Sequence, residues 1–229
     1  MKFKSAIVAE GSGSIAGIVF SHNAGGQYMR QRVVPTNPQT IHQVEVRQAL
    51  TTLTSRWKNI LTEPKRAAWR TYALNVKLPD AFGDLRTRSG LNHYVRSNVA
   101  MIGAGKAVQD NAPTVFNLGE FTMPTVTASH ATQKISMSFN NTDLWANEDN
   151  SYLLAYASRA QNDSIMFFKG PYRHYQSIAG NHTTPLVSPL AVDAPFEFEA
   201  GQKVFVQIVI VRADGRVSSP VRTFCVAAA

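Results

Sequence analysis

The hydrophobic pattern of this 229-residue chain changes its period near Asn111-Ala112-Pro113-Thr114. Upstream of this point, apolar residues recur every three or four positions, which is typical of amphipathic helices. Downstream, short β-type runs are separated by clusters of Asn, Asp, Gly and Pro. A chain of this length holds one or two domains at roughly 100–200 residues each. The change of period therefore predicts an α+β protein with two domains, residues 1–112 and residues 113–229.

Three helices are predicted in the first domain. The first should begin near Thr40, the second after Thr62 and the third after Ser89, because Ser and Thr side chains accept hydrogen bonds from the unpaired amides of a helix start. We interpret Trp57 and Trp69 as core residues that hold these helices together. The apolar stripe of the first helix is formed by Val46, Leu50, Leu53, Trp57 and Ile60.

A β-hairpin is predicted before the helices. Residues 15–34 contain two β-type runs around a glycine-containing turn at residues 23–26. In the second run Tyr28, Arg30 and Arg32 share one face, because side chains alternate along a strand. An isolated two-stranded hairpin is marginal in water. This hairpin must therefore lie against its own helices or against another chain, and both alternatives stay open.

The second domain is predicted to be a small β-sandwich. Its β-type runs are residues 135–139, 152–156, 165–168, 204–211 and 217–224. The last two runs flank Ala213-Asp214-Gly215-Arg216, in which the Asp-Gly pair is a local signal of a hairpin. Several short strands within this length favour a sandwich over other all-β arrangements.

The positive charge of the chain lies in its first half. The net charge is +8, yet residues 1–112 hold 15 Lys and Arg against 6 Asp and Glu, whereas residues 113–229 hold 8 against 9. A polyanion-binding surface, a surface that docks onto an acidic protein, and an Arg-rich solvated face are three interpretations that stay open. The candidate partner-binding residues are Tyr28, Arg30, Arg32, Arg47 and Arg56. Nucleic-acid binding would also use Lys58, Lys65, Arg66 and Arg70.

Motifs for catalysis, cofactors and metals are not found. Residues 11–17 are rich in glycine but precede a hairpin instead of a helix, so we interpret them as a flexible lead-in. The six histidines show no metal-ligand spacing, and Cys225, the single cysteine, ends a predicted strand as buried thiols do. We therefore expect no enzyme, no cofactor, no metal and no small-molecule substrate. Carbohydrate binding through Trp145, Tyr172 and Tyr175 is a weaker alternative.

Membrane and secretion signals are also not found. No apolar run approaches the roughly 18 residues of a membrane span. The apolar residues 6–9 are too short for a secretory signal. From these patterns we expect a soluble protein that is not secreted and has no membrane partner.

Residues 203–226 resemble the last two strands of a fibronectin type III domain. The resemblance rests on the long apolar strand, the turn with Asp214-Gly215 and the following Ser219-Pro220-Val221. It implies an immunoglobulin- or fibronectin III-like sandwich. The sequence departs from that family in lacking its early tryptophan, because Trp145 lies in a polar stretch that we interpret as a loop.

A second resemblance covers most of the chain. Residues 19–38, the helices of Trp57 and Trp69, and Ser89-Gly90-Leu91-Asn92 resemble proteins of bacteriophage and prophage genomes. The resemblance implies a virion or virion-assembly role without naming a site in the particle. Because a basic, hairpin-bearing half precedes a near-neutral sandwich, we expect a structural protein that docks through residues 1–112 and displays residues 113–229. Within the particle we expect it to be capsid-associated or decorating, after assembly in the bacterial host cytoplasm. Its expected partners are other virion proteins and further copies of itself. A neck or tail component and a nucleic-acid-binding protein remain alternatives.

Overall fold

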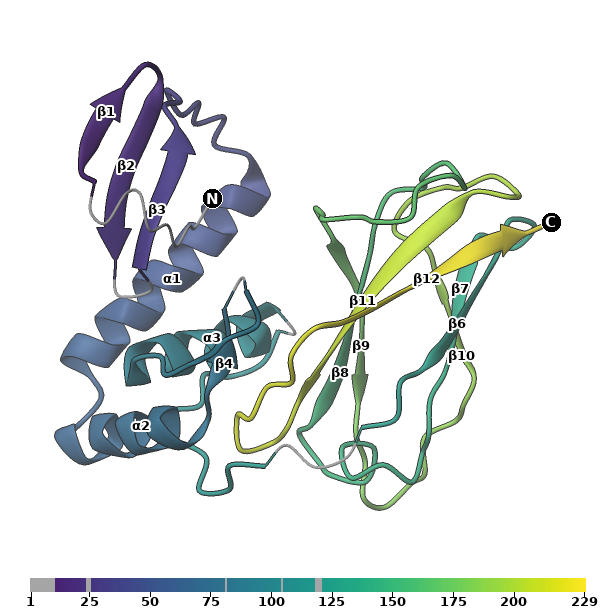
Figure 1. The fold of residues 1–229 in the computed structure, drawn as a ribbon. Coiled ribbons are helices and arrows are strands. Elements are labelled where there is room, and N and C mark those ends of the chain that lie inside the picture. The colour runs from purple at the N-terminus through teal and green to yellow at the C-terminus, as the bar shows by residue number, and fades with distance from the viewer. Residues whose placement is uncertain (1–10, 24–25, 81, 104, 118–120) are drawn as a thin grey trace. The chain divides into compact units, whose positions relative to one another are not determined.

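The computed structural model describes residues 11–229 except 24–25, 81, 104 and 118–120 (Figure 1). The described residues form three helices, a three-stranded sheet, a seven-stranded sheet and a two-stranded sheet. The predicted α+β class is therefore confirmed. The chain divides into two compact units, Met1–Val44 and Glu45–Ala229. The boundary predicted near residue 112 lies inside the second unit, and separate folding of residues 113–229 stays a prediction.

The first unit contains a three-stranded antiparallel sheet. Its strands β1 (Gly13–Ile15), β2 (Ile18–Asn23) and β3 (Gly26–Gln31) follow one another in space as in sequence. β2 and β3 form the predicted hairpin, whose turn residues 24–25 lie outside the described residues. β1 corrects our interpretation of residues 11–17 as a flexible lead-in. Residues 6–9, considered above as a signal, also lie outside the described residues.

β1 exists because its turn has the geometry that an antiparallel pair needs. Ala16 and Gly17 have φ angles of 46° and 81°, between the paired residues Ile15 and Ile18. Positive φ at both central positions gives a turn whose twist matches that of the strands. The glycine-rich pattern therefore makes a second hairpin here.

Three helices follow the three-stranded sheet in the chain and precede the seven-stranded sheet. They are α1 (Ile41–Asn59), α2 (Glu63–Asn75) and α3 (Gly90–Gly103), and all three predicted starts are confirmed. The Ser89 hydroxyl caps α3 by accepting a 3.2 Å hydrogen bond from the amide of Asn92. Thr62 precedes α2 without a side-chain cap. The two-stranded sheet of β4 (Leu78–Pro79) and β5 (Leu85–Arg86) lies between α2 and α3 in the chain.

The core of the helical region is aromatic. Trp69 and Tyr94 are fully buried with ring centroids 5.6 Å apart, and Trp57 lies 5.5 Å from Tyr94. This confirms both tryptophans as core residues. The predicted stripe of α1 is only partly covered, because Leu53 is buried whereas Val46, Leu50 and Ile60 are 48%, 47% and 59% exposed.

Asp110, in the segment after α3, links all three helices. Its carboxylate accepts two 2.7 Å hydrogen bonds from the guanidinium of Arg56 on α1 and one of 3.2 Å from the hydroxyl of Tyr94 on α3. Its backbone carbonyl accepts a 3.0 Å bond from the indole of Trp69 on α2. Hydrogen bonding from Arg56 holds the pKa of Asp110 below its usual range. The carboxylate is therefore ionised at neutral pH and can keep both partners.

The large sheet has the order β10-β7-β6-β12-β11-β8-β9. Neighbouring strands are antiparallel except β12 and β6, which run parallel. A single core takes side chains from β6, β7, β8, β9, β11 and β12, so the sheet curls around that core and is nearly closed (Figure 1). Its strands are β6 (Thr125–Ser129), β7 (Lys134–Ser138), β8 (Tyr152–Ala157), β9 (Arg173–Ala179), β10 (Leu190–Asp193), β11 (Lys203–Val211) and β12 (Val221–Ala228).

Two segments cover the outer face of this sheet. Alternate residues of β11, such as Val209 and Val211, point away from the main core and pack with Met101 of α3. Further along the same face, Phe168 from the loop between β8 and β9 stacks on Phe205 of β11 at 5.6 Å between centroids. β11 is thus covered on both faces, which agrees with its almost continuous run of apolar residues.

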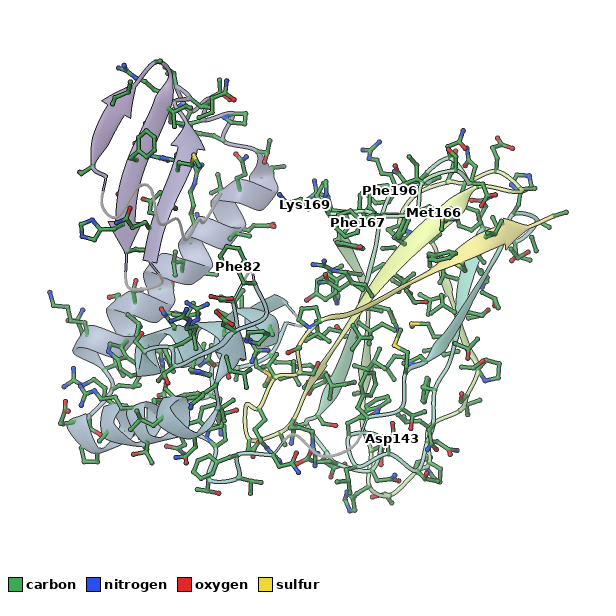
Figure 2. All side chains as sticks on the ribbon, viewed as in Figure 1. Phe82, Asp143, Met166, Phe167, Lys169 and Phe196 are labelled. Atoms are coloured by element: carbon green, nitrogen blue, oxygen red, sulfur yellow. The ribbon has the colours of Figure 1, made fainter. Side chains whose placement is uncertain are left out.

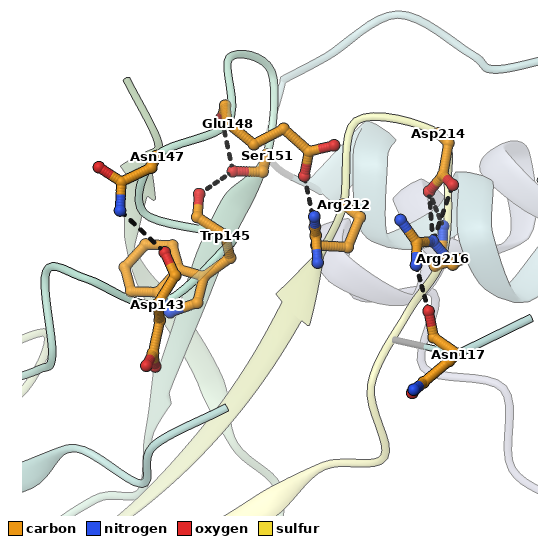
Figure 3. Close-up of polar contacts among 9 residues, drawn as sticks. All are labelled: Asn117, Asp143, Trp145, Asn147, Glu148, Ser151, Arg212, Asp214 and Arg216. Carbon is orange, nitrogen blue, oxygen red and sulfur yellow. Dashed lines mark hydrogen bonds and ion pairs between the residues drawn. The ribbon is translucent and has the colours of Figure 1, made fainter. Parts of the chain in front are cut away.

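Polar contacts fix the turn between β11 and β12 (Figure 3). The buried Arg212 pairs with Glu148, and the buried Arg216 pairs with Asp214 and donates to the carbonyl of Asn117. On the same turn, Val217 and Ser218 accept hydrogen bonds of 2.8 and 2.6 Å from Arg96 of α3. The helical region is thereby attached to this end of the large sheet.

Trp145 lies in a loop, as the sequence indicates, but it is buried. Its side chain is 1% exposed and its ring contacts Phe139 at 5.4 Å between centroids. The hydroxyl of Ser151 donates to its backbone carbonyl (Figure 3). Trp145 is therefore a core residue of the large sheet and offers no surface for stacking a sugar.

Candidate functional site

One face of the N-terminal sheet is apolar, and two of its side chains are exposed among the described residues. The strand register pairs Ile15 with Ile18 and Phe20 with Met29, so these four side chains point to the same side. Ile15 is 71% exposed and Ile18 is 40% exposed. None of the residues described between 11 and 44 is buried. A hollow of about 510 Å³ on this sheet is lined by Ala16, Gly17, Ile18, Met29, Arg30 and Gln31.

The five residues that the sequence singled out for partner binding are divided between the two units. They are Tyr28, Arg30, Arg32, Arg47 and Arg56. Tyr28 and Arg30 share the face of β3 opposite the apolar side chains, and Arg32 follows directly after that strand. Arg47 is an exposed residue of α1, while Arg56 is engaged by Asp110. The structure thus places Tyr28 and Arg30 on the same face of β3, whereas Arg56 forms an ion pair with Asp110 within the chain.

Further cations of the basic half are also paired. Arg66 contacts Glu63 at 3.0 Å, and Arg70 contacts the same carboxylate. Hydrogen bonding from Arg70 lowers the pKa of Glu63. Together with Arg56, three of the cations that nucleic-acid binding would use already face carboxylates. The positive charge offered by the helices is smaller than the sequence count indicates.

A second candidate surface, the aromatic hollow, lies on the outer face of the large sheet. Its volume is about 190 Å³, and its residues come from β11, β12 and the loop between β8 and β9. Met166 and Phe167 on this loop are 77% and 73% exposed (Figure 2). Clusters of exposed apolar side chains mark interaction sites. The hollow is lined by Met166, Phe167, Phe168, Tyr172, Phe205, Arg222, Thr223 and Phe224.

The aromatic hollow carries positive charge. The guanidinium of Arg222 lies 5.6 Å from the ring centroid of Tyr172. The ammonium of Lys203 lies 4.7 Å from the ring centroid of Phe224, but it is buried and paired with Asp163 at 3.3 Å, so Arg222 supplies the charge that the hollow offers. None of its eight lining residues is acidic. Lys169, on the same loop, is exposed. A ligand for this surface should combine an apolar group with negative charge.

A broader groove is formed by the turn between β6 and β7, the residues after β8 and the segment before β11. Its volume is about 680 Å³, and it includes Gln202, the neighbour in sequence of Lys203. Arg159 lies over the ring of Phe196 at 4.9 Å. The carboxylates of Glu197 and Glu199 are exposed. The groove is lined by His130, Gln133, Arg159, Ala160, Phe196, Glu197, Phe198, Glu199 and Gln202.

A hydroxyl, an imidazole and a carboxylate meet in the loop after β9. The Thr183 hydroxyl lies 3.2 Å from Nε2 of His182, whose Nδ1 contacts Asp149. The side chains of His182 and Asp149 are 67% and 50% exposed, so no apolar wall shields them from water. We assign no reaction to this group.

Other reactive groups are few among the described residues. Burial raises the pKa of the Cys225 thiol to about 11, so it is protonated at neutral pH and unreactive. In the part of the chain that the structure describes, no three His, Cys, Asp or Glu side chains gather as a metal site would require. No described helix is long and apolar enough to cross a membrane.

The sequence interpretation missed the aromatic hollow because it assigned residues 165–168 to a strand. They form a loop instead, and β9 starts only at Arg173. The turn-forming Asn162-Asp163 and Gly170-Pro171 on either side were the signal for a short exposed connection. Tyr175 was expected in a loop but belongs to β9, where it is partly buried and its hydroxyl donates to the sulfur of Met137.

Comparisons with known proteins give little information. No protein-family model and no curated protein matches the chain. A solved structure that matches is the crystal structure of a family 76 glycoside hydrolase from a bovine Bacteroides thetaiotaomicron strain, with 12% identity and a TM-score of 0.33. The match covers 48% of this chain and 21% of that enzyme, so it spans about a fifth of the enzyme's length.

This match contradicts our expectation from the sequence that the protein is not an enzyme, and we do not retain that expectation. A TM-score of 0.33 gives no argument about fold, activity or substrate for this chain. No catalytic residue is assigned on its basis.

Proposed function

We propose that the protein is a component of a bacteriophage particle, associated with or decorating the capsid, that docks through its N-terminal sheet. The observation that carries this proposal is the absence of any buried residue among those described between 11 and 44. A small sheet needs a packed apolar face to be stable in water. Ile15 and Ile18, which are 71% and 40% exposed, belong to such a face, and in this proposal a partner protein covers them.

The second unit is the displayed part in this proposal. We further propose that its large sheet is a fibronectin III-like sandwich. Support comes from the strand order, in which β10-β7-β6 and β12-β11-β8-β9 form groups of three and four strands around one core. Trp145 fills that core from outside the strands, which accounts for the missing early tryptophan of the family pattern.

Protein docking is favoured over nucleic-acid binding by the charge pairing. Arg56, Arg66 and Arg70 face carboxylates, so fewer cations remain for phosphates. The apolar face of the N-terminal sheet also fits a protein partner better than a polyanion.

The first test is the composition of the particle. We expect mass spectrometry of particles purified from the strain that encodes this chain to find it, at a copy number on the order of hundreds per head. A copy number of about a dozen would assign it to a neck or tail ring instead. Absence of the chain from mature particles would overturn the proposal.

The second test removes the docking element. A chain of residues 35–229 should keep its circular dichroism and thermal transition but no longer enter particles, because the second unit has its own core. A matched control is Lys58→Glu in the full chain, which changes an exposed cation of α1 and should still enter. A truncated chain that enters particles as the full chain does would refute docking through this sheet.

A further inference from the structure

We propose that two copies of this chain pair through their second units, with the aromatic hollow of each copy binding the acidic segment of the other. The acidic segment is residues 193–199, Asp-Ala-Pro-Phe-Glu-Phe-Glu. This inference does not depend on docking by the N-terminal sheet, because both surfaces belong to the second unit.

The aromatic hollow has the properties of an uncovered contact surface. Met166 and Phe167 are about three-quarters exposed, and Phe224 and Val226 beside them on β12 are 45% and 46% exposed. Large apolar side chains gathered at one place are costly in water. The loop that bears the first two residues is held to the sheet by the stacking of Phe168 on Phe205. The surface is therefore presented on a fixed support.

Charge decides which partner fits. The hollow has Arg222 in its lining and Lys169 beside it, with no acid among its lining residues. The acidic segment has three acids and no base. Asp193 contacts Lys134 at 3.4 Å and Glu199 lies 4.0 Å from the imidazole of His130, while the side chains of both Glu197 and Glu199 are exposed to solvent. The segment thus offers the negative charge that the hollow lacks.

Size and apolar character agree with this partner. Phe196 of the acidic segment is half-buried and lines the open groove (Figure 2). A cavity of about 150 Å³ holds a benzene ring. The hollow, at about 190 Å³, can therefore hold one phenyl ring. Glu197, the residue after Phe196, would then lie near Arg222 and Lys169.

The positions of the two surfaces favour mutual pairing. Gln202 lines the groove, and the next residue, Lys203, has its ammonium 4.7 Å from the ring centroid of Phe224 in the hollow. Figure 2 shows Phe196, Met166 and Phe167 at one end of the large sheet. In a twofold dimer, each surface of one copy meets the other surface of its partner. Two copies can therefore bury both hollows at once.

Sedimentation equilibrium of the full chain tests this pairing by exchanging charges. We expect a monomer–dimer equilibrium that weakens about tenfold in Arg222→Glu, and equally in the double variant Glu197→Arg with Glu199→Arg. Each variant alone places like charges at both contacts. An equimolar mixture of the two variants restores opposite charges at both contacts, so it should form a heterodimer with close to the original affinity.

Controls separate this interface from the N-terminal sheet. Phe167→Ser should weaken the dimer without a change in the thermal transition, because that side chain is exposed. Lys58→Glu makes the same charge change as Arg222→Glu at a distant exposed site and should leave the dimer unaffected. A chain that is monomeric at 1 mM, or a mixture that does not restore pairing, would overturn the inference. If Ile18→Ser abolishes dimerisation and Arg222→Glu does not, the dimer forms through the N-terminal sheet. That outcome would also overturn the inference.

Discussion

The seven-stranded sheet and the three-stranded sheet of this chain both contain apolar side chains, yet the two sheets differ in what covers those side chains. In β11 of the seven-stranded sheet, every residue except Gln207 is buried. In the three-stranded sheet, Ile15 and Ile18 remain exposed and none of the residues described between 11 and 44 is buried. The difference arises from α3 and from the loop before β9, which cover the outer face of β11. Strand formation and strand burial are thus separate properties, and the second depends on the neighbours.

This comparison has a functional meaning. A sheet covered on both faces can support a displayed surface without a partner. A sheet with an uncovered apolar face gains stability when a partner covers it. In the proposed function, the seven-stranded sheet folds without a partner, and the three-stranded sheet docks onto another protein.

The largest expected effect is the loss of a core side chain in the covered sheet. Trp145→Ala should lower the free energy of unfolding by about 3–5 kcal/mol, because it leaves a cavity beside Phe139. Urea unfolding followed by circular dichroism measures this. Phe167→Ala, at an aromatic residue that is 73% exposed, is the matched control and should change it by less than about 0.5 kcal/mol. Equal losses in both variants would contradict the burial pattern.

A smaller effect is expected where the helices are joined. Asp110→Asn should cost about 2 kcal/mol at pH 7, because Arg56 loses its charged partner at a site that is partly open to solvent. Thermal and urea unfolding of both proteins measure the difference. Asp84→Asn, at a more exposed carboxylate that contacts Arg86 at 3.5 Å, is a control with little expected effect.

The same substitution predicts a pH dependence. The pKa of Asp110 is depressed in the folded state, so its stabilisation is present above the unfolded value of about 3.9 and is lost as the pH falls through the folded pKa. The stability difference between the original chain and Asp110→Asn should stay constant from pH 7 to about pH 5 and shrink below about pH 4. A difference that grows on acidification would contradict an ionised Asp110.

The smallest effect on stability is expected in the uncovered sheet. Ile15→Ser with Ile18→Ser should change the free energy of unfolding of the isolated chain by less than about 0.5 kcal/mol, because these side chains are exposed before docking. The same variant should lose incorporation into particles. Ile135→Ser, at a fully buried position of β7, is the matched control and should destabilise strongly. A large loss of stability in the first variant would show that this face is covered within the chain.

Local patterns predicted most of the secondary structure. The three helices begin where Thr40, Thr62 and Ser89 indicated, because the start of a helix and its i, i+4 stripe depend on neighbouring residues, such as the capping hydroxyl of Ser89 in α3 and Pro64 in the first turn of α2. The hairpin turn at Asp214-Gly215 formed for the same reason, and Gly215 has the positive φ of 91° that such a turn needs. These features need no information from distant parts of the chain.

Contacts between distant residues decided the rest. From the sequence, Arg56 is expected to be an exposed cation of the first helix. Its 2.7 Å hydrogen bond to Asp110, 54 residues away, instead joins that helix to the segment after α3. Residues 165–168 read as a strand, but the neighbouring edge is taken by β9, so they fold over Phe205 as a loop. Trp145 lies in a loop, as expected, but its side chain belongs to the core because the sheet curls around it.

The sequence by itself therefore determined the elements of this protein, and the tertiary structure decided which faces they bury. Hydrogen bonds within a helix or hairpin join residues that are close in sequence, so composition and spacing reveal them. Burial depends on which element lies opposite, and in this chain α3 covers Val209 and Val211 from more than 100 residues away. Among the described residues, no such element covers Ile15, Ile18 or the aromatic hollow. Both candidate binding surfaces lie there, because apolar area that folding leaves in water remains available for association.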